Sequence, residues 1–514
     1  MLFNSAEYLL LFLPIVLVVF IRLARTGNTE AQISWLIVAS IFFYGSWNPA
    51  YVGLIIISLV VNFAIGRQLA NRVLYSRHGW LIAGLSFNLG LLAYFKYAGF
   101  FVDNLNAVGL WLIPMPEIVL PLAISFFTFQ QIAYLVDVAR DECSEYQFRH
   151  YALFVLFFPQ LIAGPIVHHR EMMPQFEKLR LDMYLSKDLA VGLTIIAIGL
   201  FKKVVLADSL AVYADPLFAA AGTGTPLAPI DAWIATFSFT FQIYFDFSGY
   251  SDMAIGSARL FGIRLPENFR SPYKANNIIE FWRHWHMTLS RFLRDYLYIT
   301  LGGNRRGSGR RYGNLLVTML LGGLWHGAAW TYVVWGGLHG VFLCINHAWH
   351  KLCRDFDLQW LQSAPWLRPF YVLITFLAVS LSFTIFRATD LDSGVAILQA
   401  GFGITTDQPA ALLKYAITSS SLGEIFTSLG VEKGSYLAVY CLLAISAGIC
   451  WLLPNTQRFM QDFRPVLGTG YLSARTRFDL RWRPGWASSC LIAVLLSLGL
   501  LSLTSVSEFI YFQF

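Results

Sequence analysis

Long apolar runs alternate with short charged stretches along almost the whole chain. A bilayer core of ~30 Å is crossed by about 20 apolar residues in a helix, so each run of this length predicts one membrane-spanning helix. The pattern therefore predicts an all-α polytopic membrane protein with about 11 to 13 spanning helices. The runs fall at residues 8–21, 33–47, 50–66, 79–99, 119–136, 190–212, 231–260, 312–327, 329–349, 367–386, 436–453 and 487–505.

The run from Tyr151 to Val167 differs from the others because it contains Pro159, Gly164 and Pro165. Proline removes a backbone hydrogen-bond donor and clashes with the preceding turn. Irregular backbone at membrane depth is tolerated only where protein or a water-filled cavity covers it. The run therefore predicts either a re-entrant hairpin or an ordinary span with a proline kink.

Residues 264–311 carry ten Lys and Arg against three Asp and Glu, yet their centre is strongly aromatic. Between Phe281 and Tyr296 the apolar and the basic positions each recur at helical spacing. Asn277 and Glu280, three residues apart, resemble a capping box that would start the helix. The segment predicts one amphipathic helix at the cytoplasmic interface, with arginines that meet lipid phosphates or an anionic substrate. The apolar stripe is Trp282, His286, Leu289, Leu293 and Leu297, and the basic one is Arg283, Arg291 and Arg294.

Composition agrees with a membrane protein. Hydrophobic residues make up 57% and charged residues 13% of the 514 residues, and the mean hydropathy is +0.57. Soluble domains typically contain about 25% charged residues, so a soluble enzyme is excluded. The net charge of +7 lies in short loops between apolar runs, which indicates membrane topology rather than nucleic-acid binding. The six cysteines form no C-x-x-C pair, so we expect neither a disulfide framework nor a thiolate metal site, and no bound cofactor.

The basic residues also predict the orientation of the chain, because short loops rich in Lys and Arg are cytoplasmic. The first run, residues 8–21, is preceded by Glu7 and followed by Arg22 and Arg25, the reverse of the basic start of a signal peptide. We therefore expect this run to remain as the first span, with the N-terminus outside. The basic segments that alternate with the predicted spans are residues 67–77, 202–203 and 458–483.

The stretch from Tyr312 to His350 contains no Asp, Glu, Lys or Arg, and His326 and His339 lie within it. An ionisable side chain at membrane depth is rare and usually faces a cavity or a pathway. A functional role is the favoured interpretation of His326. For His339 we favour a core histidine that is satisfied by hydrogen bonds.

Two acidic residues, Asp246 and Asp252, lie in the predicted span at residues 231–260. A carboxylate in apolar surroundings must pair, take up a proton or line water, so both side chains are expected to point inward. They could orient a catalytic base. The favoured interpretation is structural, a pairing with an arginine of the aromatic helix.

Together these stretches resemble the membrane-bound O-acyltransferase family, and within it the bacterial branch that O-acetylates alginate and related polymers. The resemblance runs in order from the N-terminus to about Asn346, and the last third of the chain adds little. The motifs are Leu161-Ile162-Ala163-Gly164-Pro165, Tyr244 to Asp252, Phe281-Trp282-Arg283 with Trp285-His286 and Thr288-Leu289-Ser290, Arg294 to Ile299, Leu301 to Arg305, and Leu324-Trp325-His326-Gly327.

The resemblance implies a single domain over residues 1–514, with core motifs at 119–350 and further helices at 367–514, that encloses a tunnel. It implies that His326 is the essential histidine of the family and that His286 is a second histidine near the tunnel. It also implies a bacterial inner-membrane enzyme with a cytoplasmic thioester donor, acetyl-CoA, an exopolysaccharide acceptor outside and a periplasmic acetyltransferase-like partner. His284 departs from the pattern, since many relatives carry an arginine there.

Transfer of acetyl from a thioester to an alcohol needs a base for the hydroxyl proton and donors for the oxyanion. Imidazole suits the first task near neutral pH. The indole of Trp325 or backbone N–H groups near the glycines could serve as the donors. The expected donor-binding and substrate-binding residues are Arg283, Arg291, Arg294, Trp325, Asp246 and Asp252.

Two other functions were weighed. A histidine-rich metalloenzyme would need closely spaced histidine pairs with carboxylates in reach, whereas the histidine pairs here are scattered. A polysaccharide or lipid transporter would share the broken run and the intramembrane acids, but it would be expected to show internal repeats, and we find none.

Overall fold

The computed structural model describes residues 1–514 except 72–75, 110–112, 116–117, 144–146, 163, 180–184, 306, 405–435, 469–479, 505–509 and 511–514. The described residues are mainly helical, and their only β-type pairing is an isolated bridge between Pro266 and Leu467. The predicted all-α class is therefore confirmed. The chain gathers into two compact units, and two of the boundaries between them fall inside the helices α10 (Leu185–Leu200) and α12 (Pro229–Leu260). The expected single domain stays a prediction.

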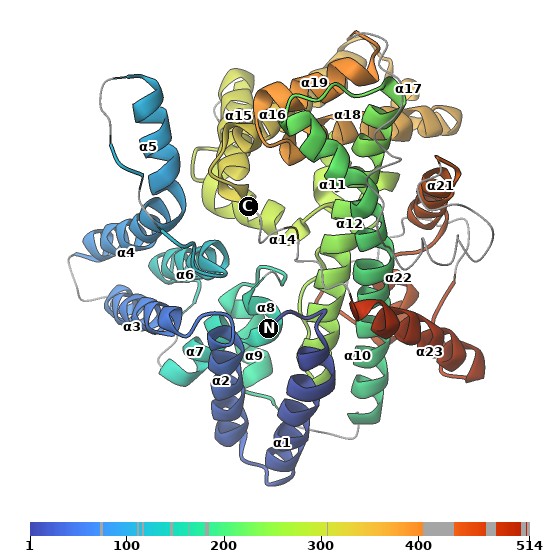
Figure 1. The fold of residues 1–514 in the computed structure, drawn as a ribbon. Helices are drawn as coiled ribbons and strands as arrows, with labels where there is room; N and C mark the ends of the chain where they lie inside the picture. The colour runs from blue at the N-terminus through green and yellow to red at the C-terminus, as the bar shows by residue number, and fades with distance from the viewer. Residues whose placement is uncertain are drawn as a thin grey trace. The chain divides into compact units, whose positions relative to one another are not determined.

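The first unit comprises residues 1–198, 250–267 and 463–470. A π-helical turn, Glu7–Phe12, leads directly into α1, so that Glu7–Arg25 is one continuous apolar helix. The helices of this unit are α1 (Leu13–Arg25), α2 (Thr29–Gly45), α3 (Ala50–Ala70), α4 (Arg77–Leu92), α5 (Ala98–Ala107), α6 (Ile124–Ala139), α7 (Phe148–Leu156), α8 (Phe158–Leu161), α9 (His169–Phe176) and most of α10 (Leu185–Leu200) (Figure 1).

The proline-containing run is broken as its sequence predicts. Helix α7 ends at Leu156, Phe157 leaves the helical conformation with φ −45° and ψ 106°, and the short α8 begins at Phe158. Residues 151–161 are buried throughout. Covered by protein in this way, the broken backbone meets the condition for irregular structure at membrane depth, and re-entrance stays a prediction.

The second unit comprises residues 199–249, 268–462 and 471–514, and it holds most of the predicted site. Its helices are α11 (Asp208–Gly222), the first part of α12 (Pro229–Leu260), α13 (Ile278–His284), α14 (Met287–Phe292), α15 (Gly307–His326), α16 (Trp330–Asp355), α17 (Gln359–Ser363), α18 (Arg368–Arg387), α19 (Leu391–Gly401), α21 (Tyr436–Leu452), α22 (Thr456–Phe459) and α23 (Trp486–Leu501).

Five helical stretches of the described chain are long and apolar enough to cross a membrane, which agrees with a polytopic membrane protein. Helices α15 and α16, predicted as spans, are not among the five. Both carry polar residues, such as Asn314 near the start of α15 and Asn346 in the second half of α16. The five stretches are Glu7–Arg25, Ala50–Ala70, Arg77–Ala107, Leu185–Gly222 and Pro365–Arg387.

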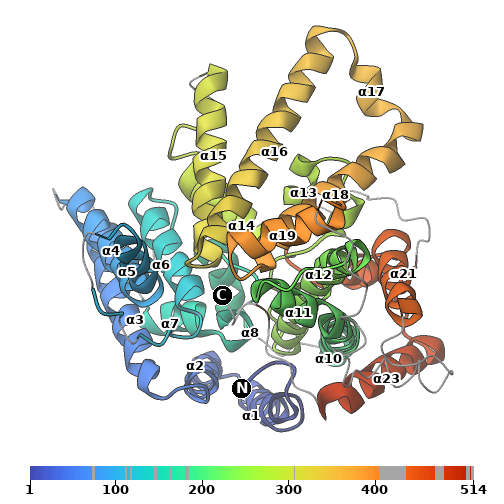
Figure 2. The same cartoon turned by 45° about the horizontal axis from the view of Figure 1, so that its top comes forward.

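Helices α15 and α16 lie side by side and form a hairpin in both views (Figure 1, Figure 2). Their contact depends on two glycines. A Cβ atom added at Gly323 would lie 2.2 Å from the carbonyl oxygen of Tyr332, and one added at Gly336 would lie 2.2 Å from that of Met319. Small residues let helix backbones approach closely, and this approach fixes where α15 ends and α16 begins. His326 is the last residue of α15.

The aromatic segment is not one helix as predicted. Helix α13 starts after Asn277, whose side chain accepts a hydrogen bond from Glu280 N, in agreement with the predicted cap. It stops at His284, and His286 has φ 41° and ψ 52° before α14 begins. The stripe at helical spacing is interrupted because the backbone near His286 is held by a separate segment, as Met287 N donates to Asn268 O at 2.9 Å.

Lys202 and Lys203 do not lie in a cytoplasmic loop as predicted, but in a π-helical turn, Phe201–Ala207, of the continuous helix Leu185–Gly222. The ammonium group of Lys203, 1% exposed, lies 2.7 Å from Asp208 Oδ1 and 2.7 Å from Asp246 Oδ1. Ile510 N donates to the second oxygen of Asp246 at 3.3 Å. Asp246 is therefore paired, as expected, but its partner is a lysine and not an arginine of the aromatic segment.

We expect Gly323→Ala to lower the unfolding temperature in detergent, because an overpacked helix contact costs about 1–3 kcal/mol. The matched control is Gly313→Ala on the same helix, where an added Cβ meets no atom within 4 Å. Equal unfolding temperatures for the two variants would contradict the close contact.

We expect Lys203→Met to destabilise the protein strongly, because loss of one partner from a buried ion pair costs about 3–5 kcal/mol. Arg481→Gln serves as the control, since it breaks an exposed pair with Asp462 whose two side chains are 42% and 46% exposed. Thermal unfolding monitored by size exclusion in detergent measures both. A Lys203→Met protein as stable as the control would mean that the lysine does not hold the two carboxylates.

Candidate active site

His326 lies at the C-terminal end of α15 and is 4% exposed. Its ring is enclosed by aromatic side chains: the centroid of Trp335 lies 5.0 Å away at an interplanar angle of 90°, and that of Phe386 lies 5.5 Å away at 78°. The ring centroid of His286 lies 6.4 Å from that of His326. The two histidines that the sequence selects are therefore brought together in one buried, aromatic site.

Asn268 fixes the tautomer of His286. Thr288 donates to Asn268 Oδ1 from its main-chain nitrogen, at 3.4 Å, and from its hydroxyl, at 2.9 Å, so this oxygen acts as an acceptor. His286 Nδ1 lies 3.1 Å from the same oxygen and must therefore carry the proton of the neutral ring. Nε2 is then the nitrogen with the lone pair. Burial lowers the pKa of His286 to about 3, in agreement with a neutral imidazole.

The backbone at His286 is itself unusual. A positive φ at a residue other than glycine costs of order 1–3 kcal/mol and persists only where the surroundings enforce it. Here the side chain of Asn268 accepts a hydrogen bond from the ring of His286, and the main-chain oxygen of Asn268 accepts one from Met287 N. Because of this left-handed turn, the imidazole of His286, in the short connection between α13 and α14, points toward the ring of His326. A continuous helix would not direct it there.

Trp325 also belongs to this cluster. It is 4% exposed, and its ring centroid lies 5.1 Å from that of His326 and 6.2 Å from that of His286. Its indole N–H can only donate. The side chain therefore adds a hydrogen-bond donor group to the cluster of the two histidines.

His339 lies on α16, not on a common helix with His326. It is fully buried, and it makes hydrogen bonds with Trp282 and Ser382. The predicted role as a core histidine satisfied by hydrogen bonds agrees with these contacts.

The three predicted arginines line a single cavity of about 700 Å³ between the aromatic segment and the α15–α16 hairpin. Arg294 is additionally paired with the adjacent Asp295 at 2.7 Å and is 62% exposed. The apolar part of the lining includes Trp282 and Met287, the neighbour of His286. We call this space the inner cavity; it is also lined by Ile279, Arg283, Ser290, Arg291, Leu293, Tyr298, Asn304, Arg311, Leu315, Thr318, Met319, Leu343 and His347.

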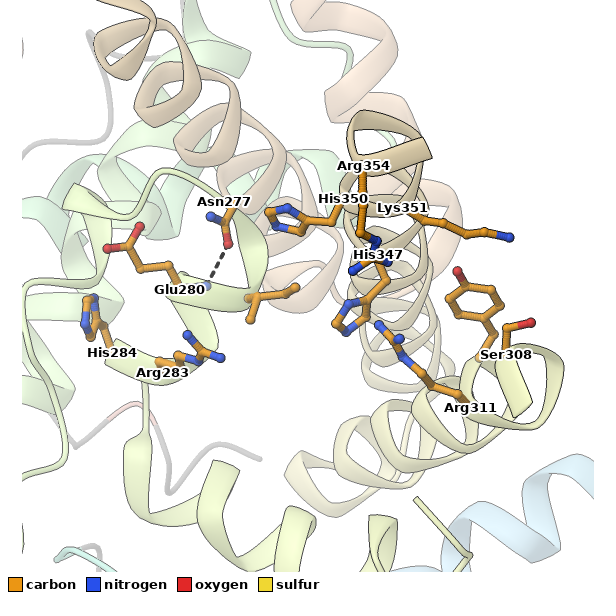
Figure 3. A pocket seen from close by; sticks show the side chains of 12 residues that line it. Asn277, Glu280, Arg283, His284, Ser308, Arg311, His347, His350, Lys351 and Arg354 are labelled. Atoms are coloured by element: carbon orange, nitrogen blue, oxygen red, sulfur yellow. Dashed lines mark hydrogen bonds between the residues drawn. The ribbon is translucent and has the colours of Figure 1, made fainter. Parts of the chain in front are cut away.

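A second cavity, also of about 700 Å³, adjoins the first, and we call it the basic cavity because Arg283, Arg311, Lys351 and Arg354 line it (Figure 3). The side chains of Arg311, His347 and Arg354 point toward one another, from α15 and α16. Glu280 is its single acidic lining residue. The two cavities share Ile279, Arg283, Arg311 and His347, so the basic cavity continues into the inner one. Its other lining residues are Asn277, His284, Ser308, Tyr312 and His350.

The two acidic candidates lie in different compact units. Asp246 is occupied by Lys203, and its neighbour Phe247 is what contacts His286, at 4.7 Å between ring centroids. Asp252 is buried in the first unit and belongs to a different part of the fold. Among the residues that the structure describes, no group of three His, Cys, Asp or Glu could hold a metal ion.

Sequence reasoning missed several residues of the site. Trp335 and His339 lie four residues apart on α16, and this spacing alone predicts that they share one face of a helix. Phe386 and Ser382 carry no signal, since they lie in an ordinary apolar run more than 40 residues later. The sequence around Asn268 gives no such signal either, because nothing in a loop sequence predicts that a side chain will form a hydrogen bond with a histidine.

Comparison with known proteins gives a consistent result. Residues 138–386 match the model of the membrane-bound O-acyltransferase family. The chain is 40% identical to a peptidoglycan O-acetyltransferase of Helicobacter pylori, over 100% of this chain and 98% of the relative. It is 38% identical to a probable alginate O-acetylase of Azotobacter vinelandii, over the full length of both. A teichoic acid D-alanyltransferase of Streptococcus thermophilus is 29% identical over 52% of this chain and 68% of the relative.

Proposed function

Since the chain belongs to the membrane-bound O-acyltransferase family and is a membrane O-acetyltransferase, we propose that it takes acetyl from cytoplasmic acetyl-CoA and delivers it to a polysaccharide outside the cell. The observation that carries this proposal is the proximity of His286 and His326 in one aromatic site. Met287, the residue that follows His286 in the sequence, lines the inner cavity. A thioester that enters through the basic cavity would reach the histidines along this route.

His326 is the general base in this proposal. It takes the proton of the acceptor hydroxyl while the oxygen attacks the thioester carbonyl, and Trp325 donates to the oxyanion. When the tetrahedral intermediate collapses, the C–S bond breaks and the thiolate takes the proton from His326, so that the base is restored. His286, whose ring centroid lies 6.4 Å from that of His326, forms the wall of the site beside the base in this proposal.

The donor is proposed from the charge of the cavities. Acetyl-CoA carries a diphosphate and a 3′-phosphate on one end and a largely uncharged pantetheine arm on the other. Guanidinium groups bind phosphate oxygens with two parallel hydrogen bonds, and Arg283 and Arg311 line both cavities. The phosphates would bind in the basic cavity and at the adjoining arginines of the inner one, Arg291 and Arg294, and the arm would extend along the apolar wall of the inner cavity toward His286.

The acceptor and the partner are proposed from the relatives. Two of the relatives are named for peptidoglycan and alginate, so the proposed acceptor class is a polysaccharide hydroxyl outside the inner membrane. Acetyl would cross through a tunnel with His326 at its narrowest part, because one base can serve two substrates only if each reaches it from its own side. A periplasmic acetyltransferase-like partner would then pass it to the polymer, and the N-terminus would face the periplasm.

We expect His326→Ala to reduce polymer acetylation at least 100-fold at unchanged membrane level, since positioned base catalysis contributes about 10²- to 10⁴-fold. The control is His78→Ala, an exposed histidine of α4. Acetyl content of the polymer and a blot of the membrane fraction measure both. More than about a tenth of the activity in the His326 variant is incompatible with a general base.

We expect joint replacement of Arg283, Arg291 and Arg294 by Gln to raise the KM for acetyl-CoA about tenfold or more, because each charge-assisted hydrogen bond contributes about 1.5–3 kcal/mol. The measurement is acetyl transfer in inverted vesicles over a range of donor concentrations. Arg368→Gln, an exposed residue at the start of α18, controls for the loss of surface charge. An unchanged KM would assign these arginines to lipid anchoring.

A further inference from the structure

We propose that His339 is a positioning residue that fixes the indole of Trp282 on the wall of the inner cavity. The proposal rests on the proposed function in one respect, namely that this cavity receives the acyl donor. It assigns a role to a histidine that takes no part in the proton transfer described above.

His339 is fully buried and is held from two sides. Trp282 Nε1, from α13, donates to His339 Nδ1 at 3.2 Å. His339 Nε2 lies 3.0 Å from the hydroxyl of Ser382, on α18, and this hydroxyl donates to the carbonyl oxygen of Val379 at 2.7 Å. The imidazole thus joins three helices: α13, its own α16, and α18.

The direction of each hydrogen bond follows from chemistry. An indole N–H can only donate, so Nδ1 accepts and carries no proton. The ring is then neutral with its proton on Nε2, and this proton points to the Ser382 oxygen, whose own proton is used by Val379. Each polar group in this series of hydrogen bonds acts either as a donor or as an acceptor. His339 therefore cannot take up a further proton on Nδ1 without losing its hydrogen bond from the indole of Trp282. His339 is therefore unsuited to act as a base.

Trp282 is the residue of this arrangement that lines the proposed donor-binding cavity. It lines the inner cavity next to Arg283, and its ring lies 5.9 Å from that of Trp335. Trp335 in turn stands perpendicular to His326 at 5.0 Å and contacts His339 at 4.8 Å. If the hydrogen bond from Trp282 were lost, its indole could rotate about the side-chain bonds into the cavity, and the packing behind the catalytic imidazole would loosen.

A residue that only filled space would be replaceable by any side chain of similar volume. The hydrogen-bond chain instead requires an acceptor at the position of Nδ1. The side-chain oxygen of asparagine can occupy that position, whereas leucine has a comparable volume and no acceptor. His339→Asn and His339→Leu are therefore a matched pair that separates the acceptor from the bulk.

The test measures acetyl transfer from acetyl-CoA in inverted vesicles for His339→Leu, His339→Asn, Trp282→Phe and the double variant Trp282→Phe/His339→Leu. Loss of a buried hydrogen bond predicts that His339→Leu lowers kcat/KM for the donor about 5- to 100-fold. The kcat/KM of His339→Asn for the donor should lie within about threefold of the parent value. Trp282→Phe, which lacks the N–H, should resemble His339→Leu, and the double variant should be no worse than either single one, because both remove the same interaction.

Three results would overturn the proposal: a His339→Asn protein as impaired as His339→Leu, a double variant whose losses multiply, or a pH profile of kcat that loses a limb in His339→Asn. The last would mean that His339 titrates during the reaction. If the leucine variant fails to fold, Trp282→Phe and His339→Asn still decide the matter.

Polymer acetylation in cells is measured on the same variants. If acetyl-CoA proves not to be the donor, the vesicle assay fails for the parent protein as well, while the cellular order of parent, Asn and Leu variants still tests His339. Failure of the proposed function and failure of this inference therefore give different results.

Discussion

Each imidazole buried in this protein must find its hydrogen-bond partners inside the protein, because an unpaired polar group away from water costs several kcal/mol. The arrangement of the second unit follows from this constraint. His286 is held by Asn268 and His339 by Trp282 and Ser382, and both rings thereby acquire one defined tautomer. Opposite lone-pair positions result: Nε2 carries the lone pair in His286, and Nδ1 carries it in His339. Chemically identical side chains are thus prepared for different tasks by their partners alone.

The fold class and the central residues could be predicted from the sequence because they depend on local pattern. Apolar runs of spanning length predicted an all-α polytopic protein, and the uncharged run from Tyr312 to His350 led to the selection of His326. The break at His286 could not be predicted, since the spacing of Trp282, His286 and Leu289 fits a continuous helix. What interrupts that helix is Asn268, which lies outside the repeating pattern. Lys203 was misplaced for the same reason, since a lysine next to an apolar run suggests a loop unless its buried acidic partners are known.

Arginines line both of the adjoining cavities, and the inner cavity adds an apolar wall. The basic one gathers Arg311, Lys351 and Arg354, while the inner one is walled by side chains such as Trp282, Met319 and Leu343. Sequence reasoning selected Arg283, Arg291 and Arg294 because they are close together in the chain. The other cations come from the far ends of α15 and α16, and only the hairpin brings them to the same place. Cations and apolar side chains therefore line one continuous space, which suits a ligand that has both anionic and uncharged parts.

The hydrogen bond from Ile510 to Asp246 joins residues that are 264 positions apart in the chain. At a synthesis rate of about 5–20 residues per second, Asp246 is made roughly 13–50 s before Ile510. Lys203 and Asp208 are made before Asp246, so the ammonium group can pair with the carboxylate as soon as both have been inserted. The ion pair therefore protects a carboxylate in the nascent chain during an interval in which its last hydrogen-bond donor does not yet exist.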